Sequence, residues 1–233
     1  RTNGLNQYEP IKDKYYEYNK DIYKDIHNLK DKIHRLEDVK NYEKDIDNLE
    51  RRITTFHAEV IQDLEISDDT LVGFHGQTIY HCPDEKISRQ LGNGKLLNQL
   101  VKKNVVFDFR ANDILHGGQG APLTPIFHHL ISHQKKIRLP VCFLNIGGIS
   151  NITIITGNND FSDLASKDIG PGNCLIDNWI RKNSNKKFDH NGLIALSGTR
   201  NEIIFEQAQE LYMNRNNKKK LSLDTNDFDI SFM

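Results

Sequence analysis

Residues 141–155 read VCFLNIGGISNITII, two β-branched apolar runs separated by Gly147-Gly148. Valine and isoleucine favour strands, and two glycines between such runs allow both central residues of a tight turn to take positive φ. The stretch therefore predicts a β-hairpin with strands at 141–146 and 149–155. The turn is either an ordinary hairpin connection or one whose backbone N–H groups hold phosphate oxygens.

Outward from this hairpin, strand and helix patterns alternate from residue 70 onward. We expect a strand at 71–79 that runs into a loop and a short buried strand at 105–109. We also expect three helices: one at 121–132 opened by Pro122, one that begins at Cys174 with Asn173 as its N-cap, and one at 203–212. Such alternation predicts an α/β or α+β fold with a mixed sheet.

Residues 11–64 have a different texture, highly charged and without glycine or proline. Apolar residues recur every three or four positions in two runs, at Ile22, Ile26, Leu29, Ile33 and Leu36 and then at Ile46, Leu49, Ile53, Phe56 and Val60. The register slips between the runs, which predicts two helices or one kinked helix packed on a neighbouring domain. A coiled coil is the alternative, but neither run has the three or four unbroken heptads it needs.

Charge and composition narrow the classes of partner. The chain has 31 basic and 32 acidic residues, a balance that gives no reason to expect nucleic acid or an anionic membrane as partner. No stretch approaches the roughly 18 apolar residues of a membrane span, and the first residues do not resemble a signal peptide. The three scattered cysteines indicate a reducing compartment, which predicts the cytoplasm. The histidines show no metal-ligand spacing, so no protein metal site is predicted.

Two glycine-containing segments precede the hairpin. His75-Gly76-Gln77-Thr78 follows a predicted strand and is either a structural loop or a polar ligand-lining segment. Residues 117–122, GGQGAP, hold three glycines in four positions, an entropic cost that favours close approach of backbone to a ligand. Amides at a helix start suit anionic ligands, and Pro122 fits a first turn. Arg110 lies upstream among carboxylates, in either an ion pair or a ligand site.

The fourth segment is residues 168–173, DIGPGN, after the hairpin. We expect a loop that presents Asp168 beside the N-terminus of the next helix, so that a general base and a field that favours phosphate coexist. The alternative is an Asp that caps a helix or stabilises a turn.

In this order, GFHGQT (73–78), DFR (108–110), GGQGAPL (117–123), LNIGGISN (144–151) and DIGPGN (168–173) closely resemble the anhydro-N-acetylmuramic acid kinase family. The resemblance runs from about Phe56 to Ser197 and more loosely to the end. It implies an α/β chain with the two-lobed actin-like fold of hexokinases, built of ribonuclease H-like lobes, with ATP between the lobes and the sugar deeper in the same cleft. Residues 1–136 would be the remainder of the first lobe and 137–233 the start of the second.

The resemblance also implies the reaction and the residue roles. The 1,6-anhydro ring is opened by water and O6 is phosphorylated, giving N-acetylmuramic acid 6-phosphate and ADP. Asp168 matches the catalytic aspartate that activates the water, and Mg²⁺ accompanies ATP. The implied substrate-binding residues are His75, Gln77, Arg110, Gly118, Gln119, Gly120, Ala121 and Pro122. The implied phosphate-facing residues are Asn145, Gly147, Gly148, Gly170, Gly172 and Asn173.

The sequence departs from the family pattern in three places. Family members usually begin with a strand and a loop that grips the ATP phosphates, and continue into a Gly-rich segment that cradles the nucleotide; this sequence shows neither. Ile169 stands where the family commonly has Thr. The departures leave open a truncated or split-gene remnant that binds sugar with little or no catalysis, and a homodimer or complementing fragment as partner. Another actin-like carbohydrate kinase is a third interpretation.

Overall fold

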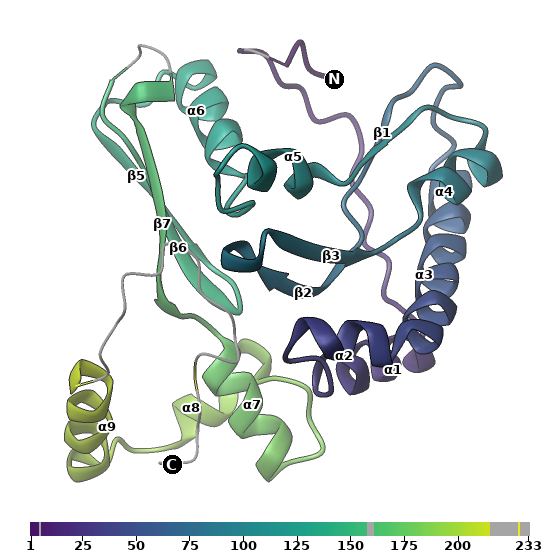
Figure 1. Ribbon diagram of the computed structural model, residues 1–233. Coiled ribbons are helices and arrows are strands. Elements are labelled where there is room, and N and C mark those ends of the chain that lie inside the picture. The colour runs from purple at the N-terminus through teal and green to yellow at the C-terminus, as the bar shows by residue number, and fades with distance from the viewer. Residues whose placement is uncertain (5, 158–160, 215–227, 229–233) are drawn as a thin grey trace. The chain divides into compact units, whose positions relative to one another are not determined.

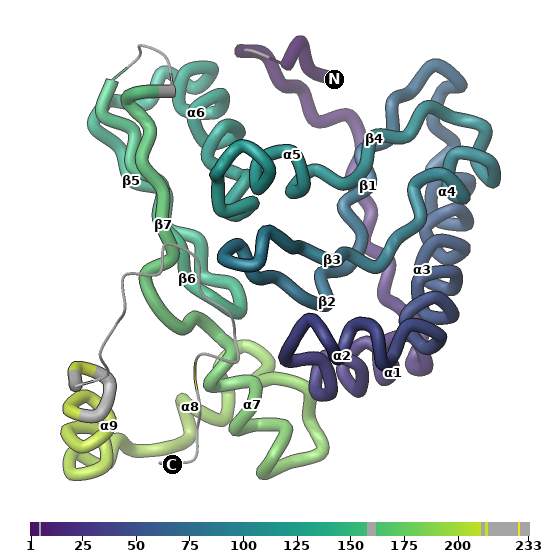
Figure 2. Tube along the Cα trace, in the orientation of Figure 1, coloured from purple at the N-terminus to yellow at the C-terminus, as the bar shows by residue number. Residues whose placement is uncertain are grey.

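The computed structural model describes residues 1–4, 6–157, 161–214 and 228, and Figures 1 and 2 trace the chain. The chain forms two compact units, one of Pro10–Ala121 and one of Arg1–Glu9 with Pro122–Met233. This division assigns residues 122–136 to the later unit, whereas the resemblance assigned them to the first lobe; the lobes themselves stay a prediction. Both units contain helices and strands, so the predicted α/β mixture is confirmed. The expected mixed sheet is not found among the described residues, where each sheet is either wholly parallel or wholly antiparallel.

Helices α1 (Lys20–Lys30), α2 (Leu36–Asn41) and α3 (Glu43–Asp63) open the unit of Pro10–Ala121. The predicted break between the two apolar runs is confirmed, but α1 ends before the first run does: Ile33 lies beyond it, and Leu36 begins the additional short helix α2. The Asn19 side chain caps α1 by accepting the Ile22 N–H at 2.8 Å. The buried residues of α1 and the first half of α3 form one core with Ile79 and Leu91, so the helices pack on strands of their own unit.

Four short strands and two helices complete this unit. Parallel strands β1 (Val72–Phe74) and β4 (Val105–Phe107) pair, and β2 (Gln77–Cys82) pairs antiparallel with β3 (Ile87–Leu91). A 3-10 turn at Pro83–Glu85 joins β2 to β3, and α4 (Gly94–Val101) and α5 (Phe109–Leu115) follow β3 and β4. The second half of α3 buries Ala58 and Ile61 against β1 and α4.

Two strand predictions in this unit were wrong in part. The single strand expected at 71–79 is divided into β1 and β2 at His75-Gly76, because Gly76 takes φ +70 and turns the chain. The strand expected to be buried at 105–109 ends at Phe107, and Val106 and Phe107 are 43% and 39% exposed. Val72 and Phe74 of the partner strand β1 are buried, so an apolar run alone does not decide burial.

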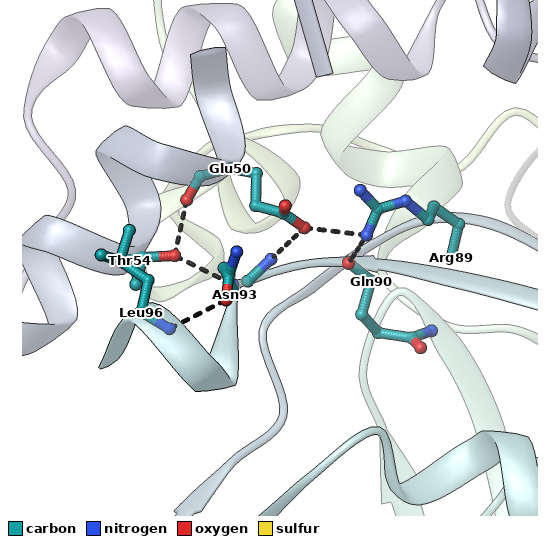
Figure 3. A network of polar contacts seen from close by, with 7 residues as sticks. Glu50, Thr54, Arg89, Gln90, Asn93 and Leu96 are labelled. Carbon is teal, nitrogen blue, oxygen red and sulfur yellow. Dashed lines mark hydrogen bonds and ion pairs between the residues drawn. The ribbon is translucent and has the colours of Figure 1, made fainter. Parts of the chain in front are cut away.

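A polar network fixes the turn between β3 and α4 against α3 (Figure 3). Glu50 Oε1 accepts hydrogen bonds from Arg89 Nη1 at 2.8 Å and from the Gly92 N–H at 3.2 Å. Thr54 Oγ1 accepts the Asn93 N–H at 3.0 Å, and the Asn93 side chain in turn caps α4. The network thus joins α3 to the end of β3 and to the start of α4.

The later unit is built on an antiparallel sheet of order β5 (Val141–Ile146), β6 (Ile149–Ile155) and β7 (Leu164–Pro171). The predicted hairpin is confirmed, with both strands at the expected residues. Helix α6 (Pro125–Gln134) lies along one face of this sheet (Figure 1). His128 Nδ1 lies 2.8 Å from Thr153 Oγ1, and the His128 ring stacks on Phe143 at a centroid distance of 4.8 Å.

Helix α6 begins at Pro125, not at 121–122 as predicted. Pro125 would occupy the second turn of a helix begun at Ala121, where its ring would clash with a preceding carbonyl and its missing N–H would break the ladder. Proline is well tolerated at the first position of a helix, so Pro125 opens α6 with Thr124 as its N-cap residue.

Helix α7 (Cys174–Asn183) follows β7 almost directly, and α8 (Leu193–Ser197) and α9 (Glu202–Asn214) come after it. The predicted helices at Cys174 and across 203–212 are therefore confirmed. Short 3-10 turns lie at Phe161–Asp163 and His190–Gly192. Among the residues that the structure describes, no helix combines the length and apolarity required to span a bilayer.

Candidate functional site

Arg110 is the centre of a polar cluster in the unit of Pro10–Ala121. It lies in the first turn of α5, donates from Nε to His75 Nε2 at 3.1 Å and donates from Nη1 to the Gly120 carbonyl at 3.0 Å. Because His75 Nε2 accepts, the ring proton is on Nδ1, which donates to the Gly76 carbonyl at 2.8 Å. These bonds fix the imidazole and the guanidinium in one arrangement.

The charge of Arg110 has no counter-ion within the described ranges, where its hydrogen-bond partners are a neutral ring and a carbonyl. Burial lowers the pKa of the Arg110 guanidinium, although arginine remains protonated in proteins. Its Nη2 atom makes no hydrogen bond to any residue described. The ion-pair interpretation of Arg110 is therefore not what the structure shows, and the cluster can accept an anionic or hydroxyl-bearing ligand.

The glycine loop at 117–120 was predicted to open a helix, but it ends α5. Gly117, at φ +87, donates to the Ile114 carbonyl, and Gly118 donates to the Asp113 carbonyl at 2.8 Å, the bonding pattern of a Schellman C-cap. Gly120 N–H donates to Asp113 Oδ2 at 2.6 Å. The amides of Gly117, Gly118 and Gly120 are thus used within the loop, and helix-start amides for an anion are not present here.

The remaining residues that we predicted to line the sugar lie in the segments next to His75 and to the glycine loop. Gln77 is the first residue of β2, opposite Leu91, and is half-buried. A Cβ added at Gly76 would meet the Leu91 carbonyl, so the close approach at Gly76 is to β3 and not to a ligand. Gln119 and Ala121 are half-buried in or beside the glycine loop, and Pro122 belongs to the later unit.

Asp168 lies in strand β7, not in the loop that we predicted. It is opposite Asn151 of β6, which is itself opposite Asn145 of β5. Residues directly opposite in antiparallel strands point to the same face, so these three polar residues form one row across the sheet. The strand continues to Pro171 because β7 is an edge in the described sheet, where the missing N–H of proline is tolerated.

A β-bulge lies beside Asp168. The pairing of β6 with β7 shifts between Ser150 and Asn151, so that Ile169 is the extra residue on β7. Bulges bend a strand and redirect the side chains next to them, and they are frequent at active sites. Asp168 is half-buried at this position. Asn151 was missed as a candidate residue, and its signal is visible only once the strand register is known.

The hairpin turn and the start of α7 are joined by backbone hydrogen bonds. Gly172 and Cys174 donate to the Gly148 carbonyl at 2.9 and 3.2 Å, and Asn173 donates to the Gly147 carbonyl at 2.7 Å. A Cβ at Gly172 would overlap the Gly147 carbonyl oxygen, which explains glycine there. We call these contacts of 147–148 with 172–174 the turn–helix clasp.

Several details of the clasp differ from expectation. Neither Gly147 nor Gly148 has positive φ. The strands pair Ile146 with Ser150, which leaves a three-residue connection instead of the predicted two-residue turn. Asn173 occupies the N-cap position of α7, but its side chain does not cap the helix and instead donates weakly to the Ile146 carbonyl at 3.5 Å. Within the described part of the chain, the Gly148 N–H is without a hydrogen-bond partner.

The phosphate-facing residues predicted from the resemblance are therefore in different situations. The amides of Gly172 and Asn173 are used in the clasp, whereas the Gly148 N–H points to no protein acceptor that the structure describes. Gly170 is buried in β7, opposite Ser150. No group of three His, Cys, Asp or Glu side chains in the described ranges is arranged to hold a metal ion.

Comparisons with known proteins agree on one family. The family model for anhydro-N-acetylmuramic acid kinase matches residues 4–229. An anhydro-N-acetylmuramic acid kinase from Pelagibacter ubique is 51% identical over 237 residues, covering 100% of this chain and 63% of that protein. Relatives of the same name from Methylobacterium nodulans and Agrobacterium fabrum are each 39% identical, covering 76% of this chain and 48% of their own lengths. The chain thus spans between about half and two thirds of these relatives.

Proposed function

Because the chain belongs to the anhydro-N-acetylmuramic acid kinase family, we propose that the protein opens 1,6-anhydro-N-acetylmuramic acid with water and transfers the γ-phosphoryl group of ATP to O6. The products are N-acetylmuramic acid 6-phosphate and ADP, and the reaction belongs to peptidoglycan recycling in the cytoplasm. The observation that carries the proposal is the family match, which extends over residues 4–229. The actin-like fold is part of the same proposal, supported by the antiparallel sheet β5–β6–β7 that leads into α7.

Asp168 is the general base in this proposal. Its carboxylate takes a proton from water as the water oxygen bonds to the anomeric carbon. The bond from that carbon to O6 breaks, and O6 takes the γ-phosphoryl group as ADP leaves. A strand holds a catalytic side chain more firmly than a loop does, so the position of Asp168 in β7 favours this role. General-base assistance of this kind contributes roughly 10²–10⁴-fold in rate.

Arg110 and His75 are the proposed centre of sugar recognition. The substrate carries a carboxylate, and Arg110 offers Nη2 to it while Nε and Nη1 are fixed by His75 and Gly120. A guanidinium held in advance by two hydrogen bonds loses little freedom when it binds a ligand. The further residues that we propose to line the sugar are Gln77, Gly118, Gln119, Ala121 and Pro122.

The hairpin turn is the proposed phosphate-facing element. Gly148 supplies its N–H, and Gly147, Gly172 and Asn173 shape the turn through the clasp. Asn145, also expected to face phosphate, is the β5 member of the row that contains Asp168, and Gly170 lies two residues beyond Asp168 on β7. Mg²⁺ fits this donor set only as an ion carried mainly by the ATP phosphates and water, since the described residues build no cage for it. When bound, it neutralises charge on the transferring phosphoryl group.

The alternative of a remnant with sugar binding alone is not favoured, because 51% identity to the Pelagibacter relative extends over all of this chain. A homodimer or a complementing fragment stays a prediction. A substrate-competition assay distinguishes this proposal from the alternative of another actin-like carbohydrate kinase. We expect that N-acetylglucosamine does not compete with the anhydro-sugar.

Mass spectrometry of the product tests the proposal. Purified full-length protein with ATP, Mg²⁺ and 1,6-anhydro-N-acetylmuramic acid is expected to give a sugar that has gained one water and one phosphoryl group. A matched variant, Lys167→Ala, changes the exposed residue next to Asp168 and should give the same product at the same rate. A phosphorylated sugar that keeps its anhydro ring, or no ATP-dependent product, would overturn the assignment.

A further inference from the structure

Asn151 lies directly opposite Asp168, at the place where the sheet register changes. The pair Asn151–Asp168 is the first pair after the bulge at Ile169, and Asn145 continues the row on β5. Opposite residues have Cβ atoms about 4.5–5.5 Å apart and side chains on the same face. This separation suits two side chains that share one water molecule between their tips.

No structural role for Asn151 is visible in the described residues. Asparagine is disfavoured inside strands, where its side chain competes with the backbone for hydrogen bonds. An asparagine inside a strand is therefore expected to make a side-chain hydrogen bond that compensates for this cost. The Asn151 side chain makes no hydrogen bond within the described ranges, although it is half-buried. Local rules broken without structural compensation are typical of functional positions.

The next row of the same face shows a contrast. Phe143, Thr153 and Ser166 are one step further along the three strands, and Thr153 is 1% exposed beneath α6, where it pairs with His128. In that row Thr153 is covered by α6 and has a hydrogen-bond partner in His128. The row of Asn145, Asn151 and Asp168 is more open, from half-buried to exposed, so a small molecule can reach it.

We propose that Asn151 positions the water molecule that Asp168 activates, with Asn151 Oδ1 accepting one hydrogen of the water while the Asp168 carboxylate accepts the other. The inference rests on the proposed function and names a residue that the family resemblance did not assign. Two acceptors fix the two hydrogens of the water, so the oxygen lone pair is directed away from the sheet toward the anomeric carbon. The proton passes to Asp168, the oxygen bonds to carbon, and Asn151 is unchanged at the end of the step.

Steady-state kinetics of the full-length protein test this role. Asn151→Ala should lower kcat by roughly 10²-fold, as expected when one positioned hydrogen-bonding group is lost at a reacting atom, and leave KM for ATP unchanged. Asn151→Asp places a second carboxylate opposite Asp168, and like charges raise the apparent pKa of such a pair. The acid limb of its pH–rate profile should therefore move to higher pH, an effect that a merely structural asparagine would not produce.

Controls separate this inference from the proposed function. Lys167→Ala, on the opposite face of β7, should retain the wild-type kcat and pH profile. Thermal unfolding establishes that each variant is folded, and Asn151→Asp carries the test if Asn151→Ala does not fold. The inactive variant Asp168→Asn establishes that Asp168 is required. Given that result, a wild-type kcat in Asn151→Ala or an unshifted pH–rate profile in Asn151→Asp overturns the role of Asn151. Absence of turnover in the wild-type protein overturns the proposed function itself.

Discussion

At the scale of single residues, Arg110 shows how position and partner define a role that residue type leaves open. From sequence, an arginine among carboxylates is as easily an ion pair as a ligand group. The structure pairs it with His75 and the Gly120 carbonyl, both neutral, and leaves one guanidinium nitrogen for a ligand. The planar fork of arginine satisfies both fixed partners at once, which the single ammonium group of lysine does not.

Arg110→Lys should therefore weaken sugar binding more than ATP binding. We expect KM for the anhydro-sugar to rise by roughly tenfold or more, the effect of one charge-assisted hydrogen bond, with KM for ATP unchanged. Initial-rate kinetics of the full-length protein measure both constants. Arg200→Lys, at an exposed residue, is the matched control and should change neither. An unchanged sugar KM in Arg110→Lys would remove Arg110 from the site.

His57 provides a pH-dependent contribution to stability. It is half-buried on α3 beside Phe74, its Nε2 lies 2.9 Å from the Tyr18 hydroxyl, and burial lowers its pKa. The unfolded chain, with a histidine pKa of about 6.5, then binds more protons than the native protein in the interval below that value. The free energy of unfolding should fall as pH decreases through about 6.5 and level off below the native pKa.

Urea denaturation at about pH 7.5 and about pH 5 checks this sign. His128, whose pKa burial also lowers, contributes in the same direction, so His57→Gln should reduce the difference between the two pH values without abolishing it. The carboxylates with lowered pKa, Asp38, Asp63 and Asp189, act only at more acidic pH. An equal or greater free energy of unfolding at the lower pH would contradict the proposed contribution of the buried histidines.

The sequence predicts only those site residues that belong to a recognisable local motif. The motifs around Asp168, His75 and Arg110 identified those residues, but not Asn151. A two-residue turn at Gly147-Gly148 would have placed Asn145 and Asn151 on opposite faces of the hairpin. The observed register, Asn145 opposite Asn151, is shifted by one residue on β6, and such a shift moves a side chain to the other face.

At the scale of elements, the turn–helix clasp joins the two glycine segments that the sequence presented separately. Hydrogen bonds from Gly172, Asn173 and Cys174 to the hairpin carbonyls fix the turn against the start of α7. The hairpin, α7 and α9 were predictable because their signals are local. The start of α6 and the burial of β4 were not, because one depends on which of two prolines opens the helix and the other on what covers the strand.

Gly172→Ala tests the clasp. Its added Cβ would overlap the Gly147 carbonyl oxygen and push the turn away from α7, so we expect a loss of about 1–3 kcal/mol in stability and a raised KM for ATP. Thermal denaturation and ATP kinetics measure the two effects. In the control Gly198→Ala, the new Cβ meets nothing closer than 3.7 Å, and neither quantity should change. A folded Gly172→Ala variant with the wild-type KM for ATP would show that the turn–helix clasp does not contribute to nucleotide binding.

At the scale of the whole molecule, the chain consists of two compact units, and each holds one part of the proposed chemistry. The Arg110 cluster belongs to the unit of Pro10–Ala121, and the row of Asp168 belongs to the other. Alternating signals in the sequence were enough to predict an α/β chain. Assignment of the units to actin-like lobes rests on the family, and the chain spans 63% of one relative and 48% of two others.

The central claim is that Asp168 activates the water in a reaction that couples ring opening to phosphoryl transfer. Single-turnover kinetics of the full-length protein and of Asp168→Asn, following ring opening and ATP cleavage in the same sample, test it most directly. The account predicts that both processes slow together in the variant by roughly 10²-fold or more, while ATP still binds. Ring opening and ATP cleavage at the wild-type rate in Asp168→Asn would contradict it.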